Sequence, residues 1–443
     1  MRAVILAAGE GKRLRLHFSG PKPLVPLLGL SLIERNILSL RECGINNFVI
    51  ITGCYSSEIQ DHLGNGNKFG VNITYLHNPD WKLGNGVSAY TFGKDYRQGE
   101  KFILLMSDHV FEPEVLKAFI AEAPNLKEDE LLLAADRNLQ NVHDLAECTK
   151  VKAEQDLAVK LGKELRDFNA VDCGLFIGTG ALLDALSEAI SQCRYTLTDA
   201  VNILAGRSKV KLHFVNGAWI DVDDLPSYRQ AEKILLRSLV PPKDGFVSRV
   251  LNRRVSLQIT KLFARTSITP NQVTFLSFLI STASAVFFAV VHPLYGGLLA
   301  QLSSILDGVD GELARLKFLK SNYGGLFDAV LDRYADFFIV LGMAYAWYSE
   351  TENPLALLTC AAVLTGMPMS MLIKEKFHAL TGKPFIPEFY DGLLRYLPAN
   401  RDGRLFIIML GGILNLISAT LILLATVTHL QALARLYKAR KLM

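Results

Sequence analysis

The sequence lacks the cysteine patterns that bind zinc or form a disulfide framework. Its six cysteines are scattered over 443 residues, with no CxxC pair and no cluster of cysteine and histidine. We therefore expect no disulfide scaffold and no zinc site, and a reducing cytosol is the simpler environment for the first half. The apolar run at residues 2–8 is too short for a secretory signal peptide. The N-terminal half is therefore expected to remain in the cytoplasm.

A large excess of charge of one sign is also absent, because the formal net charge is only +4. Apolar residues make up 50% of the chain but are divided unevenly along it. Residues 1 to about 235 have the composition of a soluble α/β protein, whereas apolar runs long enough to cross a bilayer dominate from about residue 270 onward. The length exceeds one ordinary hydrophobic core, so at least two domains are expected. No nucleic-acid partner is expected.

Short apolar runs alternate with amphipathic stretches in the first half of the chain. Residues 31–43 carry apolar side chains at helical spacing after a serine cap, which predicts a helix. Six apolar runs predict buried strands: 2–8, 46–52, 72–77, 101–108, 130–136 and 172–178. This alternation predicts an α/β three-layer domain over residues 1–232, built on a Rossmann-like, mostly parallel sheet.

The second half begins with a basic amphipathic segment, residues 233–268, which we expect to lie at the membrane surface. Residues 269–443 are then expected to form an all-α transmembrane domain of six helices. The predicted spans are 271–291, 294–317, 324–348, 354–373, 388–414 and 415–437. Basic links alternate with links that lack Lys and Arg, as the positive-inside rule requires. This pattern predicts a multi-pass protein of the cell membrane, with the N-terminal domain and the C-terminus in the cytoplasm.

Acidic side chains interrupt the second and third predicted spans. Asp307 and Asp310 are three residues apart, and Asp328, Asp332 and Asp336 follow at intervals of four, so each set shares one helix face. Ionisable side chains in apolar helices are costly and indicate function. Carboxylates that face one another cannot all stay ionised without cations, and divalent ions that prefer oxygen ligands meet that need. The pattern predicts a two-metal site suited to displacement at phosphorus.

One motif joins these acids: Asp307-x2-Asp310-Gly311-x2-Ala314-Arg315-x8-Gly324-x3-Asp328-x3-Asp332. It resembles the signature of the CDP-alcohol phosphotransferases, and the resemblance covers about residues 240–443. The resemblance implies that Asp307, Asp310, Asp328 and Asp332 hold two Mg²⁺ or Mn²⁺ ions. It also implies that Asp332 acts as the general base on the acceptor hydroxyl.

The same resemblance implies that Gly311, Ala314 and Arg315 lie against the CDP group. The alternative is a structural ion-pair network in which Arg315 and Arg333 are the counter-charges, but two arginines cannot neutralise five aspartates. Asp336 lies one turn beyond the motif, and a supporting role for it is left open.

A glycine-rich loop follows the first predicted strand, where backbone N–H groups can approach phosphates. Lys12, Arg13 and Lys22 supply positive charge for a triphosphate and a leaving diphosphate. The loop reads Leu6-Ala7-Ala8-Gly9-Glu10-Gly11-Lys12-Arg13-Leu14, followed by Pro21-Lys22-Pro23-Leu24. This run resembles the sugar nucleotidyltransferases over about residues 1–232. The resemblance implies nucleotide binding by Leu6, Ala7, Ala8, Gly9, Gly11, Lys12 and Lys22, and catalytic roles for Lys22 and Arg13.

Further positions match that family. Asn85, Gly86 and Ser88 resemble its loop around the base. Asp108 resembles its first metal-binding position, and either Asp221 or Asp223 resembles its second, for one or two ions. Asp172, with Lys160 and Lys163, can hold the second substrate, whereas His109 is expected to pack locally. The implied reaction is attack by a phosphomonoester oxygen on the α-phosphorus of a nucleoside triphosphate, through positioning and charge neutralisation.

A membrane domain that uses a CDP-alcohol needs a donor, and the N-terminal domain has the chemistry to make one from CTP. The pairing resembles the bifunctional inositol-1-phosphate cytidylyltransferases and di-myo-inositol-phosphate-phosphate synthases. In that family CTP and inositol 1-phosphate give CDP-inositol, and a second inositol 1-phosphate then attacks it and releases CMP. The resemblance also implies a homodimer formed through the membrane domain.

Two alternatives stay open. The chain could make a phospholipid of the phosphatidylinositol or phosphatidylcholine type, or its N-terminal half could be a non-catalytic binding module. A non-catalytic module predicts erosion of its motif, yet Gly9, Gly11, Arg13, Lys22 and Asp108 are all present. A phosphorylated acceptor would need a cationic pocket, for which the candidates are Lys374, Arg395, Arg401 and Arg404, although these charges can equally serve only to set the topology.

Overall fold

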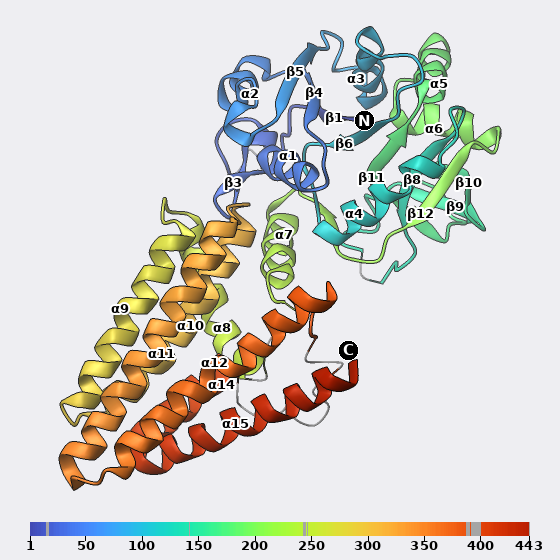
Figure 1. Cartoon of the computed structure of the whole chain (residues 1–443). Coiled ribbons are helices and arrows are strands. Elements are labelled where there is room, and N and C mark those ends of the chain that lie inside the picture. The colour runs from blue at the N-terminus through green and yellow to red at the C-terminus, as the bar shows by residue number, and fades with distance from the viewer. Residues whose placement is uncertain are drawn as a thin grey trace. The chain divides into compact units, whose positions relative to one another are not determined.

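The computed structural model describes two compact units, residues 1–237 and 238–443 (Figure 1). The described residues are 1–14, 17–140, 142–241, 245, 247–386, 390 and 400–442. The first unit ends within helix α7 (Leu225–Ser238), which continues past residue 232.

The N-terminal unit is built on a nine-stranded sheet of order β5-β4-β1-β6-β11-β8-β12-β10-β9. Its strands are β1 (Arg2–Ala7), β4 (Asn47–Thr52), β5 (Asn72–His77), β6 (Phe102–Met106), β8 (Leu131–Asp136), β9 (Lys150–Glu154), β10 (Leu157–Gly162), β11 (Ala170–Gly178) and β12 (Val210–Phe214). Two short ribbons pair β2 (Pro26–Leu27) with β3 (Leu30–Ser31) and β7 (His109–Phe111) with β13 (Trp219–Asp221). All six predicted strands are present, but β5 is not buried as predicted, because its residues are exposed or half-buried.

The predicted mostly parallel sheet is confirmed only in part, because the sheet is mixed. Strands β5, β4, β1 and β6 run parallel, but β11 is antiparallel to both β6 and β8. Strands β9 and β10 are also antiparallel. Only Gln155 and Asp156 separate them, and so short a connection can join only antiparallel strands. Both strands carry lysines between apolar residues, and so does β12, so none of these three forms a continuous apolar run and none was predicted.

Helices cover both faces of this sheet. Val4 and Leu6 of β1 lie in one core with residues of α3 (Asn85–Thr91), α5 (Gly180–Ser191) and α6 (Leu197–Gly206). Ala3 and Ile5 point to the opposite face and are fully buried too. Figure 1 shows α1 (Leu32–Glu42) and α4 (Pro113–Ala121) on that side. Helix α2 (Ser56–Leu63) lies between β4 and β5 in the chain. Ser31 and Glu34 form a capping box at the start of α1, as the serine cap predicted.

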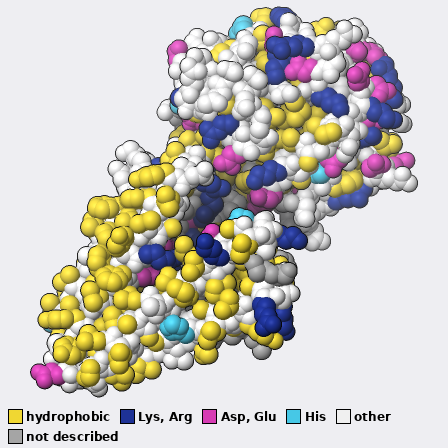
Figure 2. Space-filling model, viewed as in Figure 1, with side chains coloured by type: hydrophobic (Ala, Val, Ile, Leu, Met, Phe, Trp, Pro, Cys, Tyr) yellow, Lys and Arg dark blue, Asp and Glu magenta, His cyan; other side chains and the backbone are white. Residues whose placement is uncertain are grey.

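The C-terminal unit is helical. A π-helical turn (Ser248–Asn252) leads into α8 (Arg253–Ala264). The remaining helices are α9 (Pro270–Ala289), α10 (Pro293–Leu316), α11 (Asn322–Thr351), α12 (Leu355–Thr381), α14 (Arg401–Ile413) and α15 (Ile417–Leu442). Large apolar side chains cover much of its visible surface in Figure 2.

Three of these helices, α9, α12 and α15, are long and apolar enough to cross a membrane. Helices α10 and α11 are longer than α9 but carry the aspartates. The predicted span 388–414 is described as a helix only from Arg401, and most of its first part lies outside the described residues. The six-span count therefore stays a prediction.

Glycines bring helices of this unit into close contact. Helix α11 crosses α9 at Gly342, where an added Cβ would lie 2.3 Å from the backbone oxygen of Ala285. By contrast, Gly325 of the same helix has no atom within 4 Å of the equivalent position. Packing of α11 against α9 therefore depends on the missing side chain at residue 342.

We expect Gly342→Ala to lower the free energy of unfolding by about 1–3 kcal/mol, because overpacking must separate the two helices. The control is Gly325→Ala, which adds the same methyl group to α11 without a clash and should leave stability equal or slightly higher. Thermal unfolding in detergent checks both variants. Equal melting temperatures for the two variants would contradict this account of the α9–α11 contact.

Candidate functional site

The first candidate site is a cavity of about 580 Å³ in the N-terminal unit. It adjoins the carboxyl ends of β1 and β6, where the glycine-rich loop and Asp108 begin. Gly11 has a positive φ of 63°, and a Cβ there would lie 2.4 Å from Cβ of Lys22, so glycine allows the loop to close against that lysine. Of the predicted residues, Leu6, Ala8, Gly9, Gly11, Lys12, Arg13, Lys22, Asn85, Ser88, Asp108, Asp172, Asp221 and Asp223 line this cavity.

Two predicted nucleotide-binding residues are not among the described residues that line the cavity. Ala7 is buried in the sheet, because its side chain follows the alternation of β1. The backbone N–H of Gly86 donates to the carbonyl of Tyr195 (2.9 Å), and a Cβ at residue 86 would lie 2.6 Å from that oxygen. Gly86 therefore packs against Tyr195 within the wall of the cavity and does not face the cavity itself. Lys163 lines the cavity, but Lys160 is not in its described lining.

Asp108, His109 and Asp221 form the acidic cluster of this cavity. Ligand atoms of the three lie within 4.8 Å of one another. Strand β13 places Asp221 opposite His109 of β7, so the pairing brings the two acids together across more than 100 residues. The Oδ1 atom of Asp221 is buried and accepts no hydrogen bond from the described residues. A buried carboxylate oxygen that accepts no hydrogen bond is a suitable ligand for a divalent cation.

Asp223 has a different set of partners. It pairs with Arg13 (Nη2 to Oδ2, 3.1 Å) and with the Lys22 ammonium group, which also donates to Oδ2 of Asp108 (2.5 Å). Asp221 has a longer contact with the same lysine (Oδ1 to Nζ, 3.7 Å). The geometry therefore groups Asp221 with Asp108 and His109, and Asp223 with Arg13 and, at shorter distance, Lys22. The sequence left these two alternatives open.

The charges of the cluster shift its pKa values. Burial disfavours the charged form of Lys22, but Asp108, Asp221 and Asp223 outweigh burial and raise its pKa above the usual value. Burial also opposes ionisation of Asp108, yet Lys22 and His109 lower its pKa. For Asp221, burial and the charge of Asp108 raise the pKa to about 6. The lysine thus stays protonated at neutral pH and can hold an anion beside the carboxylates.

His109 does more than the local packing expected for it. Its ring stacks on Trp219 (centroids 6.4 Å apart) and its Nδ1 lies 3.0 Å from Oδ1 of Asp108. Burial lowers its pKa, but Asp221 and Asp108 outweigh burial and raise the pKa to about 9. Its position next to Asp108 was the one available signal. Trp81, Trp219 and the loop residues His143, Asp144, Glu147 and Cys148 also line the cavity and were missed.

Three other predicted side chains are already engaged within the wall. The side-chain oxygen of Asn85 accepts from the backbone N–H of Leu197 (2.9 Å), and the Ser88 hydroxyl accepts from Asn78 (3.0 Å). Asp172 accepts from the N–H of Gly174 (2.7 Å), and its burial raises its pKa to about 6. These contacts fix the three side chains in the wall of the cavity.

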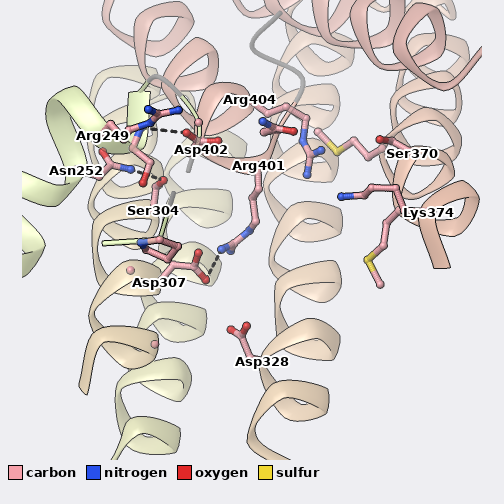
Figure 3. A pocket seen from close by; sticks show the side chains of 18 of the residues that line it. Arg249, Asn252, Ser304, Asp307, Asp328, Ser370, Lys374, Arg401, Asp402 and Arg404 are labelled. Carbon is pink, nitrogen blue, oxygen red and sulfur yellow. Dashed lines mark hydrogen bonds and ion pairs between the residues drawn. The ribbon is translucent and has the colours of Figure 1, made fainter. Parts of the chain in front are cut away.

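The second candidate site is a cavity of about 1170 Å³ in the C-terminal unit. Asp307 and Asp310 of α10 and Asp328 of α11 bring one carboxylate oxygen each within 4.8 Å of one another. Figure 3 shows Asp307 and Asp328 facing the same space from different helices. Thr274 donates to Asp310 (2.5 Å), whereas Oδ1 of Asp328 is buried and accepts no hydrogen bond from the described residues. This donor set fits a divalent cation.

Gly311 and Arg315 line this cavity as predicted, but Ala314 and Asp332 are not among its described lining residues. Ala314 lies one turn beyond Asp310, where α10 passes the end of the acidic cluster. Asp332 is covered by Arg401, whose Nη1 lies 2.9 Å from Asp332 and 2.6 Å from Asp307.

Arginines from a distant segment are the counter-charges of this cluster. Asp336 is buried and pairs with Arg404 (2.7 Å), Arg401 (3.4 Å) and Arg333 (3.4 Å). Arg401 and Arg404 had been candidates only for an acceptor phosphate, because nothing in the sequence joins them to aspartates so far away. Asp336 thus holds these three arginines in place by ion pairs. Within the described residues, three arginines thus pair with Asp307, Asp332 and Asp336. Asp328 keeps a buried oxygen that accepts no hydrogen bond from the described residues, which suits a divalent cation.

The opposite wall of the same cavity is basic and polar. Lys374 and Ser370 of α12 and Arg435 and Gln431 of α15 line it. The Arg435 guanidinium donates to the Ser370 hydroxyl, which donates in turn to Gln431 (3.2 Å). Arg395, another candidate for an acceptor phosphate, lies outside the described residues. The cavity therefore joins an acidic wall to a cationic one, as Figure 3 shows for Lys374 and Asp307.

We expect Asp221→Asn to remove Mn²⁺ from the N-terminal unit, because the change takes one carboxylate from the cluster with Asp108. Asp223→Asn is the control, since it removes an equal charge from a side chain that lies outside the cluster of Asp108, His109 and Asp221 and pairs with both Lys22 and Arg13. Electron paramagnetic resonance of free Mn²⁺ gives the number of ions bound per chain. A fall in that number for Asp223→Asn, with no fall for Asp221→Asn, would reverse the assignment.

Each half of the chain matches a known protein family. The family model described as nucleotidyl transferase matches residues 2–238, and the model described as CDP-alcohol phosphatidyltransferase matches residues 267–431. A solved structure, the inositol-1-phosphate CTP transferase from T. maritima, is 27% identical and covers 53% of this chain and 95% of its own, with a TM-score of 0.46.

Relatives with both parts span almost the whole chain. The bifunctional IPC transferase and DIPP synthase of Thermococcus kodakarensis is 35% identical, over 98% of this chain and 96% of the relative. The enzyme of the same name from Aquifex aeolicus is 33% identical, over 98% of this chain and 97% of the relative. The chain therefore belongs to the family of bifunctional IPC transferases and DIPP synthases, and it is an enzyme that joins a nucleotidyltransferase to a CDP-alcohol phosphotransferase.

Proposed function

We propose that the chain makes CDP-inositol from CTP and inositol 1-phosphate. It then transfers the inositol phosphate group of CDP-inositol to a second inositol 1-phosphate. In the first reaction a phosphate oxygen of inositol 1-phosphate attacks the α-phosphorus of CTP, and diphosphate leaves. In the second, a hydroxyl of another inositol 1-phosphate attacks the phosphorus that bears inositol. That attack releases CMP and leaves a phosphorylated di-inositol phosphate.

The first reaction belongs to the N-terminal cavity. Lys12, Arg13 and Lys22 stand beside the glycine-rich loop and balance the charge of the triphosphate and the departing diphosphate. Asp108 and Asp221 would hold one or two Mg²⁺ or Mn²⁺ ions, and a bound ion supplies further neutralisation of the phosphates. The reaction needs no protein nucleophile, because the substrate phosphate is itself the attacking group.

The second reaction belongs to the C-terminal cavity. Asp307, Asp310, Asp328 and Asp332 would hold two Mg²⁺ or Mn²⁺ ions, which polarise the diphosphate when bound. Asp332 takes the proton of the attacking hydroxyl as general base, and Gly311 and Arg315 lie against the CDP group. Arg401 pairs with both Asp307 and Asp332 and so holds these two carboxylates close to each other.

One observation carries the choice of a phosphorylated acceptor. Lys374 and Arg435 line the wall opposite the aspartates, in the same cavity. A cationic wall at that place suits a second phosphate, whereas an alcohol without charge would need no such wall. This favours inositol 1-phosphate over the acceptor of a phosphatidylinositol or phosphatidylcholine type of synthase.

The setting follows from the same proposal. The C-terminal unit is a multi-pass domain of the cell membrane with six spans, and the N-terminal unit and the C-terminus face the cytoplasm, where CTP is available. The chain works as a homodimer through its membrane domain and needs no nucleic acid.

Variants that disable one cavity each should separate the two reactions. Asp332→Asn should accumulate CDP-inositol and release diphosphate, because it lacks the general base of the second step. Asp108→Asn should release CMP only when CDP-inositol is supplied. Phosphorus NMR of purified protein with CTP, inositol 1-phosphate and Mg²⁺ follows all the products. No diphosphate from the wild type would support a non-catalytic N-terminal module, and CMP release only with a lipid partner would support a phospholipid synthase.

Lys374→Met should raise the KM for inositol 1-phosphate in the second reaction about tenfold or more, because a charged hydrogen bond contributes about 1.5–3 kcal/mol. The rate at saturating acceptor should change less. The control is Lys376→Met, since Lys376 is exposed on the same helix and is not in the described lining of the cavity. CMP release from CDP-inositol gives both constants. An unchanged KM for the Lys374 variant would contradict binding of the acceptor phosphate at this wall.

A further inference from the structure

A buried carboxylate outside the metal cluster ties α10 to the helix before the first span. Glu312 of α10 is fully buried, although it lies only two residues after Asp310. Three side chains of α8 donate to it: Arg253 (2.5 Å), Ser256 (2.6 Å) and Thr260 (2.6 Å). Neither reaction proposed above uses these four residues. A carboxylate with this number of donors is fixed in position as well as satisfied.

The same two helices are joined along one face of α10. The side-chain amide of Asn252 donates to the Ser304 hydroxyl (3.0 Å), and Gln301 donates to Asn252 (2.7 Å). Arg253 also donates to the carbonyl of Gly308 (3.2 Å), the residue that follows Asp307. The α10 positions in these contacts are 301, 304, 308 and 312, which fall on one side of a helix that turns about 100° per residue.

The metal-binding aspartates use another side of α10. By the same helical spacing, Asp307 and Asp310 lie more than a quarter turn away from that row. The polar contacts with α8 therefore hold α10 on one face, while Asp307 and Asp310 lie on another face, near Asp328. Asn252 and Arg253 also line the cavity, so this contact lies within reach of the site that it supports.

Helix α8 buries polar side chains and exposes apolar ones, which is the reverse of an ordinary surface helix. Its polar residues Ser256 and Thr260 are fully buried against α10, while Val255 and Leu262 are 43% and 64% exposed. Such an outward apolar face suits the boundary of a bilayer and cannot by itself hold α8 to α10. The buried polar contacts are thus what fixes the two helices in register.

We infer that Glu312 and Arg253 are positioning residues, which fix the rotation of α10 and so the spacing of Asp307 and Asp310 from Asp328. This inference rests on the proposed metal-dependent transfer. Oxygen ligands of Mg²⁺ must lie within about 2.0–2.1 Å of the ion, and three acidic side chains from two helices repel one another without it. A small rotation of α10 separates the ligands, and the contact with α8 opposes that rotation.

The test uses the behaviour of buried ion pairs. Removal of one partner leaves an uncompensated charge, whereas replacement of both by apolar residues is often neutral for stability. We therefore compare Glu312→Met, Arg253→Met and the double variant with Arg254→Met, which removes an exposed arginine from the same helix. All are made in an Asp108→Asn, Asp221→Asn background, so that bound Mn²⁺ reports the C-terminal site.

We expect each single variant to melt at a lower temperature and the double variant to melt close to the parent. Even so, the double variant should bind Mn²⁺ about tenfold more weakly by electron paramagnetic resonance, as loss of supporting groups does at other metal sites. It should need correspondingly more metal for CMP release from CDP-inositol, while Arg254→Met matches the parent in both. Parental Mn²⁺ affinity in a stable double variant would overturn the inference and leave a purely structural ion pair.

A milder change keeps the test decisive if the double variant does not fold. Thr260→Val removes one donor to Glu312 and keeps the charges, so its Mn²⁺ affinity should fall about two- to fivefold, and an unchanged affinity would overturn the inference. Failure of the proposed function is recognised separately, because the parent would then release no CMP with any divalent metal although Mn²⁺ binding can still be measured.

Discussion

The arrangement of the C-terminal unit depends on the electrostatic cost of carboxylates inside apolar helices. Five aspartates lie in α10 and α11, where burial of several like charges in otherwise apolar helices is costly. Arg401 and Arg404 offset part of this cost through Asp307, Asp332 and Asp336. Asp328 belongs to the same cluster and has a buried oxygen that accepts no hydrogen bond from the described residues, which suits a divalent ion. Helix α14 is therefore needed for its arginines as much as for its packing.

The two cavities solve the same chemical problem in different surroundings. Each places carboxylates from two separate segments close together, and each has basic side chains nearby: Lys22 and Arg13 in one, Lys374 and Arg435 in the other. Both can therefore hold a substrate with several negative charges next to a metal. In the N-terminal unit a mixed sheet supplies the frame, whereas in the C-terminal unit helix contacts at Gly342 and Glu312 do so. The shared arrangement fits two successive displacements at phosphorus.

The strands and site residues that a short stretch of sequence determines could be predicted from the sequence alone. Buried strands appear as continuous apolar runs, and the aspartates stand out because they interrupt long apolar helices. Strands β9, β10 and β12 were missed because lysines break their apolar pattern, so the antiparallel pairs that β10 forms with β9 and β12 were not expected. Asp221 and Asp223 could not be told apart until the pairing of β13 with β7 placed Asp221 next to His109. The partners of Arg401 and Glu312 come from distant segments, and no local pattern indicates which helix faces lie together.

The most direct test of the central claim is the position of Mn²⁺ in crystals of the protein, located by anomalous X-ray scattering. The account predicts two ions in the C-terminal unit, in direct contact with oxygens of Asp307, Asp310, Asp328 and Asp332. Crystals soaked in Mn²⁺ that show no ion among these carboxylates, with arginines as their only counter-charges, would contradict it.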